Sequence, residues 1–318
     1  MKDVDQPPPT PTTRRFGFIG VTATRSSINR VFPRWAEVLD LGAVEFDPVD
    51  LPVGTDPARY EEVVDRIAND PEHVGALVTT HKVRLLHATR DRFATLDRYA
   101  TLLGEISCIS RRGSGLHGSA KDPLTSGAAL DAFVPPRHFG TSGGHVLCLG
   151  AGGSGLAITV NLLTREDPAD RPGRIVLVNR GRDRLEECAR VLSELGVADA
   201  VDLVENAAPE RNDELMAQLP PGSLVVNATG LGKDRPGSPI TGRGRFPRHG
   251  LVWEINYRGD LDFLHQARAQ QRERTLVVED GWTYFLHGWA AVVAEAFGVE
   301  VDDRTLERLS EVASEVRG

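Results

Sequence analysis

A glycine-rich segment constrains this chain more than any other feature of its sequence. It consists of Gly150, Ala151, Gly152, Gly153, Ser154 and Gly155. An apolar run over residues 145–149 precedes it, and an apolar pattern of helical spacing over residues 156–163 follows. In the order strand, G-x-G-x-x-G, helix, the glycines permit a tight turn whose backbone N–H groups approach a pyrophosphate at the positive end of the helix. The segment therefore predicts a Rossmann domain in which these six residues bind a dinucleotide.

The residues after the next predicted strand indicate which dinucleotide. Strand 174–178 leads into Asn179, Arg180, Gly181 and Arg182, where an NAD enzyme usually presents a carboxylate to the ribose 2′-hydroxyl. A guanidinium suits a 2′-phosphate because it forms paired, charge-assisted hydrogen bonds. We therefore expect NADP as the cofactor, with NAD possible, and Asn179, Arg180 and Arg182 beside it. The alternative is that Arg182 and Arg184 only begin a solvated helix.

Strand-like and helix-like segments alternate along most of the 318 residues. This alternation predicts an α/β fold of parallel sheets covered by helices, and the length suggests roughly two domains. A segment rich in proline, glycine and serine at 135–144 indicates that the domain linker is nearby. The predicted strands are 15–20, 44–49, 75–80, 145–149, 174–178, 200–204, 223–227, 251–255 and 275–278, and the predicted helices include 58–68, 284–297 and 304–316.

Composition narrows the environment and the partners. A formal net charge of −8 gives no broad basic surface for nucleic acid or for an anionic membrane. No apolar run reaches the roughly 18 residues of a membrane span, and the proline-rich lead-in at 6–13 lacks a signal-peptide pattern and is predicted to be disordered. Cys108, Cys148 and Cys188 are too few and too scattered for a disulfide framework or a metal site. We expect buried free thiols, no metal and a cytoplasmic location.

Nine motifs in order then give the chain a clear resemblance. From Phe16 to Gly298 the sequence resembles the shikimate dehydrogenase family. The matching segments are 17–20 with Ser26 shortly after, 78–82, 104–107, 118–122, 150–155, 179–180, 227–232, 254–257 and 280–282.

The resemblance implies a substrate-binding and catalytic domain over 15–124, completed by the C-terminal helices 283–318. It implies an NADP-binding Rossmann domain over 125–282, with a cleft where the two domains meet. It also implies Lys82 and Asp122 as the catalytic pair, because reducing a ketone requires a cationic or proton-donating group at the oxygen where negative charge develops. Further implied substrate-binding residues are Ser26, Thr79, Thr80, Ser107, Lys121 and Tyr257, and further cofactor-binding residues are Asn227, Ala228, Thr229 and Gly281.

Departures from the family pattern are concentrated where shikimate would be held. Ile28 stands in place of the second serine, Ser107 in place of an asparagine, and Gly288 in place of a glutamine. Ala120 and Lys121 replace the two residues before Asp122, and the segment 78–82 is one residue short. Fewer hydroxyl and amide partners disfavour a polyhydroxylated acid.

The sequence therefore predicts an NADP-dependent oxidoreductase that transfers hydride between nicotinamide and a small cyclic ketone or alcohol other than shikimate. A true shikimate, quinate or aminoshikimate dehydrogenase is one alternative, and a non-catalytic regulatory protein that binds the cofactor or a metabolite is another. The expected partner is a small molecule, and the oligomer a monomer or homodimer. Whether Arg25, His81, Lys121 and His287 face the site is left open.

Overall fold

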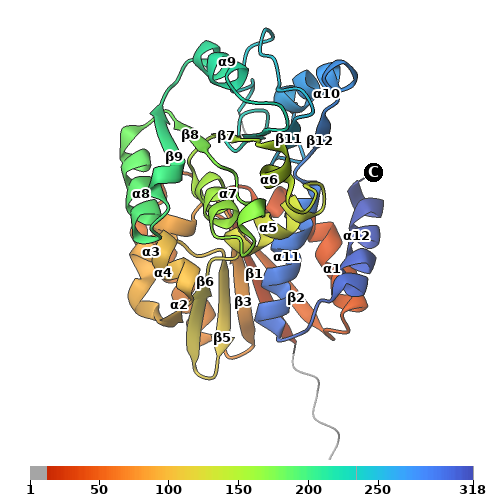
Figure 1. Ribbon diagram of the computed structural model, residues 1–318. Helices are drawn as coiled ribbons and strands as arrows, with labels where there is room; N and C mark the ends of the chain where they lie inside the picture. Colours follow the sequence, from red (N-terminus) through yellow and green to blue (C-terminus); the bar gives the residue numbers. More distant parts are fainter. Residues whose placement is uncertain (1–12, 234, 318) are drawn as a thin grey trace, which may run out of the picture. The chain divides into compact units, whose positions relative to one another are not determined.

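The computed structural model describes residues 13–233 and 235–317. The chain divides into two compact units, one of Met1–Ala120 with Ala290–Gly318 and one of Lys121–Trp289 (Figure 1). Residues 135–144, predicted to lie near the linker, fall inside the second unit and contain α6 (His138–Ser142). The predicted functional borders at 124/125 and 282/283 stay predictions. Residues 6–12 of the proline-rich lead-in lie outside the described residues.

The first unit contains a six-stranded sheet in the order β2-β1-β3-β5-β6-β4. Its strands are β1 (Arg14–Gly20), β2 (Val44–Asp50), β3 (His73–Val78), β4 (Phe93–Leu96), β5 (Cys108–Arg112) and β6 (Gly115–Ser119). Its helices are α1 (Ile28–Val38), α2 (Pro57–Asn69), α3 (Lys82–Thr89), α4 (Arg98–Leu103), α12 (Asp303–Arg317) and the short 3-10 turns Ala23–Arg25 and Arg90–Arg92.

The expectation of a parallel sheet holds for this unit except at β5, because β6 and β4 run in the same direction as β2, β1 and β3. Strands β2, β1 and β3 are parallel, but β5 runs antiparallel to β3 and forms a hairpin with β6. Gly113, with a φ of +60°, supplies the left-handed residue that the hairpin turn requires. The hairpin reverses the chain so that the start of β5 and the end of β6 reach the same sheet edge as the carboxyl ends of β1 and β3.

Helices α1 and α12 close one side of the first unit. Ile28, Val31, Phe32 and Trp35 recur at helical spacing on α1 and are all buried. The Trp35 indole N–H donates to the backbone carbonyl of Leu309 on α12 at 2.8 Å. This bond fixes the C-terminal helix against the N-terminal half of the unit, which is why the two ends of the sequence share one core.

The second unit is a doubly wound parallel sheet in the order β12-β11-β10-β7-β8-β9, the strand order of Rossmann domains. All six strands were predicted from their apolar runs. They are β7 (Val146–Leu149), β8 (Ile175–Asn179), β9 (Val201–Glu205), β10 (Leu224–Asn227), β11 (Leu251–Glu254) and β12 (Val277–Glu279). The helices are α5 (Asp122–Asp131), α6, α7 (Gly153–Leu163), α8 (Arg182–Glu194), α9 (Pro209–Ala217), α10 (Asp262–Arg274), α11 (Trp282–Phe297, which ends in the first unit) and the 3-10 turns Pro168–Asp170 and Ala198–Ala200.

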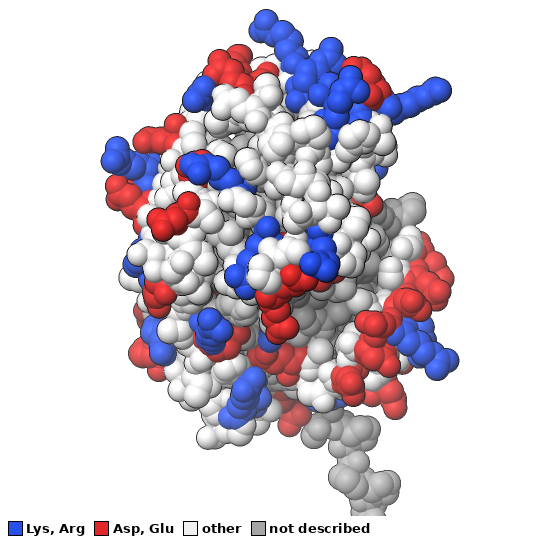
Figure 2. All heavy atoms as spheres, viewed as in Figure 1, with Lys and Arg blue, Asp and Glu red and all other residues white. Residues whose placement is uncertain are grey.

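The expectations drawn from composition concerned the cysteines, the surface charge, membrane spans and metal sites. Cys108, Cys148 and Cys188 are free and buried, which confirms the expectation of structural thiols. Acidic and basic side chains are interspersed over most of the face shown in Figure 2. Among the described residues, no helix is long and apolar enough to span a membrane, and no group of acidic, histidine or cysteine side chains is arranged to hold a metal ion.

Candidate functional site

The glycine turn between β7 and α7 has a distinct geometry at each of its three motif glycines. Gly150 has a φ of +108°, and a Cβ there would lie 2.5 Å from the Ala228 carbonyl oxygen. A Cβ on Gly155 would lie 1.9 Å from the carbonyl oxygen of Gly150. A Cβ on Gly152, the N-cap of α7, would meet nothing within 4 Å. The first and third glycines therefore allow close backbone packing, and the second leaves the helix N-terminus open to a phosphate group.

Neighbouring side chains hold this turn in place. The Ala151 N–H donates to Oδ1 of Asn179 at 3.4 Å, and the Arg184 Nε–H donates to the Ala151 carbonyl at 2.7 Å. Cys148 and Cys188 lie beneath the turn, with sulfur atoms 3.6 Å and 3.7 Å from the carbonyl oxygens of Gly150 and Ala151. Burial raises the pKa of Cys148 to about 12 and that of Cys188 to about 11, so both remain thiols. The protein's own side chains therefore support the backbone of the turn.

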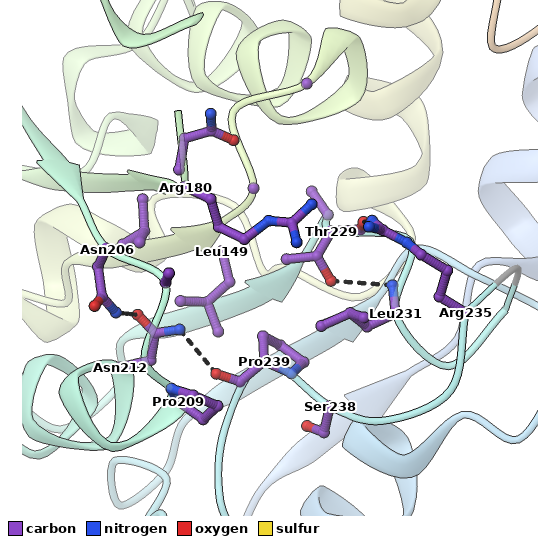
Figure 3. Close-up of a pocket in the computed structure, with 16 residues that line it drawn as sticks. Leu149, Arg180, Asn206, Pro209, Asn212, Thr229, Leu231, Arg235, Ser238 and Pro239 are labelled. Carbon is purple, nitrogen blue, oxygen red and sulfur yellow. Dashed lines mark hydrogen bonds between the residues drawn. The ribbon is translucent and has the colours of Figure 1, made fainter. Parts of the chain in front are cut away.

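A cavity of about 200 Å³ opens beside the glycine turn at the carboxyl ends of the parallel strands (Figure 3). This edge is where ligands bind in open α/β sheets. The lining consists of Leu149, Gly150, Gly152, Val178, Asn179, Arg180, Asn206, Ala207, Pro209, Asn212, Ala228, Thr229, Leu231, Arg235, Ser238 and Pro239. These residues follow β7, β8, β9 and β10, so four crossover connections build one pocket.

Two arginines give this cavity a positive charge. Arg180 follows β8, Arg235 follows β10, and Figure 3 shows their guanidinium groups pointing toward one another. Among the described residues that line the cavity there is no carboxylate. Arg180 forms no hydrogen bond or ion pair with any described residue. The apolar and amide lining with two guanidinium groups suits an adenosine that carries a phosphate.

The cavity contains about half of the predicted cofactor residues. Gly150, Gly152, Asn179, Arg180, Ala228 and Thr229 line it. Those outside its lining are Ala151, Gly153, Ser154, Gly155, Arg182, Asn227 and Gly281.

Three of the residues outside the lining have a visible structural role instead. Arg182 is 76% exposed and pairs with Glu186 one helical turn further along α8, at 3.2 Å. Gly281 packs so closely that a Cβ would lie 2.0 Å from the carbonyl oxygen of Ile255. Asn227 is fully buried and organises the loop that follows it.

The network around Asn227 supports the floor of the cavity. Its Oδ1 accepts from the Thr229 N–H at 3.1 Å and from the Thr229 hydroxyl at 2.7 Å, and its Nδ2 donates to Glu254 at 2.5 Å. Glu254 is fully buried and also accepts from the backbone N–H of Asn256 at 2.9 Å. Burial raises the pKa of Glu254 to about 7 although these hydrogen bonds oppose the shift.

In the first unit, the predicted substrate residues gather at one edge of the sheet. The Thr79 N–H donates to the carbonyl of Ile19 at 2.9 Å, so the ends of β1 and β3 are adjacent. The carbonyl of Ser107, just before β5, accepts from Val78 at 2.8 Å, and Ser107 itself is buried. Lys82 begins α3 immediately beyond this edge, and its carbonyl accepts from Ile106 at 3.4 Å. Thr80, with a φ of +56°, makes the sharp turn between them and is exposed.

The loop that carries Ser26 is also fixed. The Thr24 hydroxyl and N–H both donate to Asp50 at the end of β2, at 2.5 Å and 2.9 Å, and these hydrogen bonds lower the pKa of Asp50. Ser26 is buried, whereas Arg25 beside it is exposed to solvent. Ile28, in place of the second serine, is fully buried in the core.

His81 has a packing role. Its Nδ1 lies 2.9 Å from the Tyr60 hydroxyl and its Nε2 lies 2.8 Å from the carbonyl oxygen of Leu51. Because a carbonyl only accepts, Nε2 carries the hydrogen and Nδ1 accepts from tyrosine. Burial lowers the pKa of His81, so the neutral ring holds α2, the loop before it and the start of α3 together.

In the second unit, Asp122 is buried at the first position of α5. Its Oδ2 accepts a hydrogen bond from the Tyr284 hydroxyl on α11 at 3.1 Å. The Tyr284 ring packs edge-on against Trp253, with centroids 5.6 Å apart. Lys121, just before the helix, is half-buried, as is His287, three residues beyond Tyr284.

Tyr257 belongs to an aromatic cluster at the end of β11. Its ring centroid lies 4.5 Å from that of Phe285 and 5.6 Å from that of Trp282, and the last two rings are stacked. Tyr257 itself is half-buried. The cluster therefore presents mostly aromatic surface beside the N-terminus of α11.

Sequence reasoning missed the lining residues after β9 and those that come beyond Thr229 after β10. Asn206, Asn212 and Pro239 are joined by hydrogen bonds of 2.8 Å each, and Arg235 comes from the loop that follows the Asn227 motif. The order of strands and helices could have predicted these residues, because ligands bind at the carboxyl ends of the strands in open α/β sheets. Every residue directly after a parallel strand of this sheet is therefore a candidate for ligand binding.

Several solved structures share this architecture. Shikimate 5-dehydrogenase from Thermus thermophilus, solved with NADP(H) and shikimate, matches with a TM-score of 0.68 and 22% identity over 95% of this chain and 100% of that chain. Quinate dehydrogenase from Corynebacterium glutamicum with NAD matches with a TM-score of 0.72, 19% identity and coverage of 95% and 99%. The ligand-free 5-ketofructose reductase of a Gluconobacter species matches with a TM-score of 0.67, 19% identity and coverage of 95% and 99%.

No protein-family model and no curated protein matches the sequence. At 22% identity or less, the solved structures establish the architecture, and they do so over almost the whole of each chain compared. This architecture is the one that the nine ordered motifs implied, so the resemblance is confirmed at the level of the fold. The chain has the fold of the shikimate and quinate dehydrogenases.

Proposed function

We propose that this protein is an NADP-dependent oxidoreductase that interconverts a small cyclic ketone and its alcohol, with a substrate other than shikimate. The observation that carries the proposal is the glycine turn, where Gly152 leaves the N-terminus of α7 open and Arg180 stands in the adjoining cavity. Solved structures of the same fold contain NADP(H) or NAD.

The residues present fit such a cofactor. The backbone N–H groups at the start of α7 would hold the pyrophosphate, the cavity between Asn206 and Thr229 would hold the adenosine, and Arg180 would hold the 2′-phosphate. The nicotinamide, when bound, supplies the hydride in the reducing direction and accepts it in the other.

Lys82 and Asp122 are proposed to do the acid–base work. In the reducing direction the Lys82 ammonium stabilises the charge that develops on the carbonyl oxygen and donates a proton as the carbon accepts hydride, which leaves an alcohol and a neutral amine. Asp122 orients the substrate hydroxyl, and the Lys82 amine then recovers a proton from water. In the oxidising direction each transfer is reversed.

The proposed substrate class follows from two features, namely the loss of hydrogen-bonding residues that the shikimate dehydrogenase pattern has and a gain of apolar surface. Ile28 is fully buried where a second serine would be, and Ser107 and Gly288 offer less hydrogen bonding than an asparagine and a glutamine. The aromatic cluster around Tyr257 adds apolar surface. These features favour a ring with fewer hydroxyl groups than shikimate.

The direct test is NADPH oxidation with a panel of cyclic ketones and keto acids, including 3-dehydroshikimate, with the reverse reaction measured on the alcohols. Lys82→Ala should lower turnover by about a thousand-fold, and Asp122→Asn should lower turnover far more than it weakens NADPH binding. Tyr99→Phe, on α4, serves as a folded control.

Three outcomes would contradict the proposal or part of it. Hydride transfer that is unchanged in Lys82→Ala would remove the catalytic assignment, and tight cofactor binding without turnover of any panel member would favour a binding protein. Efficient turnover of 3-dehydroshikimate would instead identify a true shikimate dehydrogenase.

A further inference from the structure

We propose that Arg235 is a second guanidinium ligand for the 2′-phosphate of the cofactor and therefore determines the preference for NADP over NAD. The inference rests on the proposed function, because it names a specificity residue for the same cofactor. It concerns a residue that lies beyond the 227–232 motif and outside the set of predicted cofactor-binding residues.

Two cations that face the same cavity favour the binding of an anion between them. Arg180 and Arg235 both line the cavity, and Figure 3 shows their guanidinium groups directed toward one another. Like charges at close range repel, and the repulsion is strongest where protein replaces water. Other arginines nearby are neutralised, as Arg184 is by Glu187 at 2.5 Å. Neither guanidinium forms an ion pair with a carboxylate of a described residue, so the two together suit a ligand of two negative charges.

The position of the pair favours the 2′-phosphate over the pyrophosphate. Arg180 directly follows β8, the strand whose end faces the ribose 2′-position in Rossmann domains. The pyrophosphate already has the open N-terminus of α7 at Gly152. A 2′-phosphate carries nearly two negative charges at neutral pH, so a guanidinium on each side compensates it better than one alone.

Arg235 is held in position before a ligand binds. Its backbone carbonyl accepts from the Gly232 N–H at 2.7 Å, and residues 231 and 235 form a short parallel bridge. One of its Nη atoms donates to the Thr229 carbonyl at 3.4 Å, which leaves its other donors available. Thr229 is itself fixed by Asn227, and the far end of the loop is fixed by the hydrogen bond between Asn212 and Pro239. Such preorganisation lowers the entropy cost of binding.

The experiment measures cofactor affinity and needs no substrate. Dissociation constants for NADPH, NADP+, NADH and NAD+ are measured by fluorescence and calorimetric titration for the wild type, Arg235→Gln, Arg235→Lys and Arg180→Gln. Arg190→Gln is the matched control, because Arg190 lies on α8 outside the cavity, is 58% exposed and pairs with Glu194.

We expect Arg235→Gln to weaken NADP+ and NADPH binding by about ten-fold or more and to change NAD+ and NADH binding by less than about two-fold. Arg235→Lys should fall between, since it keeps the charge and loses the paired hydrogen bonds. Arg190→Gln should bind all four cofactors as the wild type does. Unchanged NAD+ affinity also shows that the variant is folded.

The failures of the two proposals are distinguishable. A wild type that binds none of the four cofactors contradicts the proposed function itself. A wild type that binds NADPH tightly while Arg235→Gln binds it equally well overturns only the role of Arg235. Equal weakening of NADP+ and NAD+ would place Arg235 at a group that both cofactors share and would overturn the 2′-phosphate assignment.

Discussion

The hydroxyl of Tyr284 donates a hydrogen bond to Oδ2 of Asp122 over 3.1 Å, and the two residues are separated by 162 positions in the chain. Tyr284 thereby restricts the carboxylate that is proposed to act on the substrate. The Tyr284 ring is in turn held against Trp253, so the hydroxyl has a fixed direction. We therefore propose that Tyr284 is a positioning residue that acts through Asp122.

Tyr284→Phe tests this relationship with little change in packing. The ring contact with Trp253 is kept and one hydrogen bond to a charged group is lost, so turnover should fall about ten-fold. Because Tyr284 does not line the cofactor cavity, the dissociation constant of NADPH should stay the same. Steady-state kinetics and a binding titration check both parts. A parallel loss of cofactor affinity would indicate general damage to the second unit and not a role at Asp122.

Alanine substitutions should separate two roles of the glycine turn. Gly152→Ala adds a methyl group where the structure has open space, so the thermal midpoint should stay within a few degrees while NADPH affinity drops by about ten-fold or more. Gly155→Ala places a Cβ 1.9 Å from a backbone oxygen and should destabilise the second unit. Calorimetry and titration together distinguish them. Normal stability of Gly155→Ala would disprove the packing role of the third glycine.

His73 should make the first unit sensitive to acid. It is buried, neither ring nitrogen has a hydrogen-bond partner among the described residues, and burial lowers its pKa from 6.5 to about 4. Between these values the unfolded chain binds a proton that the folded chain does not. Stability is therefore lost as the pH falls from 6.5 toward 4, by about 3 kcal/mol in total. His73→Leu should remove this dependence in urea unfolding at pH 5 and pH 7, and an unchanged slope would refute the assignment.

Glu254 should make the second unit less stable as the pH rises, which is the opposite of the pH dependence expected from His73 in the first unit. Its pKa is raised from 4.5 to about 7, so the folded state keeps a proton that the unfolded state releases. The associated stability is fully present below pH 4.5 and is lost as the pH rises to about 7, by about 3 kcal/mol in total. Glu254→Gln should flatten this decline in unfolding curves recorded from pH 4.5 to 8. His73→Leu in the first unit should leave it intact, which provides the internal control.

Much of the fold follows from local patterns. The apolar runs predicted every strand of the second sheet, and the glycine motif placed β7 and α7 with the correct turn between them. The β5–β6 hairpin was not predicted, because alternation of strands and helices indicates only parallel neighbours. A hairpin is determined by a few turn residues, here around Gly113, and by packing that no local pattern records.

The candidate site was predictable only in part. The motifs pointed to Arg180, which lines the cavity, and to Asp122, which is buried. Arg182 instead lies on the exposed face at the start of α8, where it pairs with Glu186. The roles proposed for Arg235 and Tyr284 depend on contacts between segments far apart in the sequence. Such contacts depend on crossover connections and helix packing, so a single sequence without the fold does not reveal them.

The thiols of Cys148 and Cys188 beneath the glycine turn can be used to measure local opening of the turn. With pKa values raised to about 12 and about 11, Cys148 and Cys188 react with a thiol reagent only when this region opens and admits water. The rate of alkylation therefore measures how often the glycine turn opens locally, and no label has to be introduced. A dinucleotide that closes over the turn would slow that reaction in proportion to its occupancy.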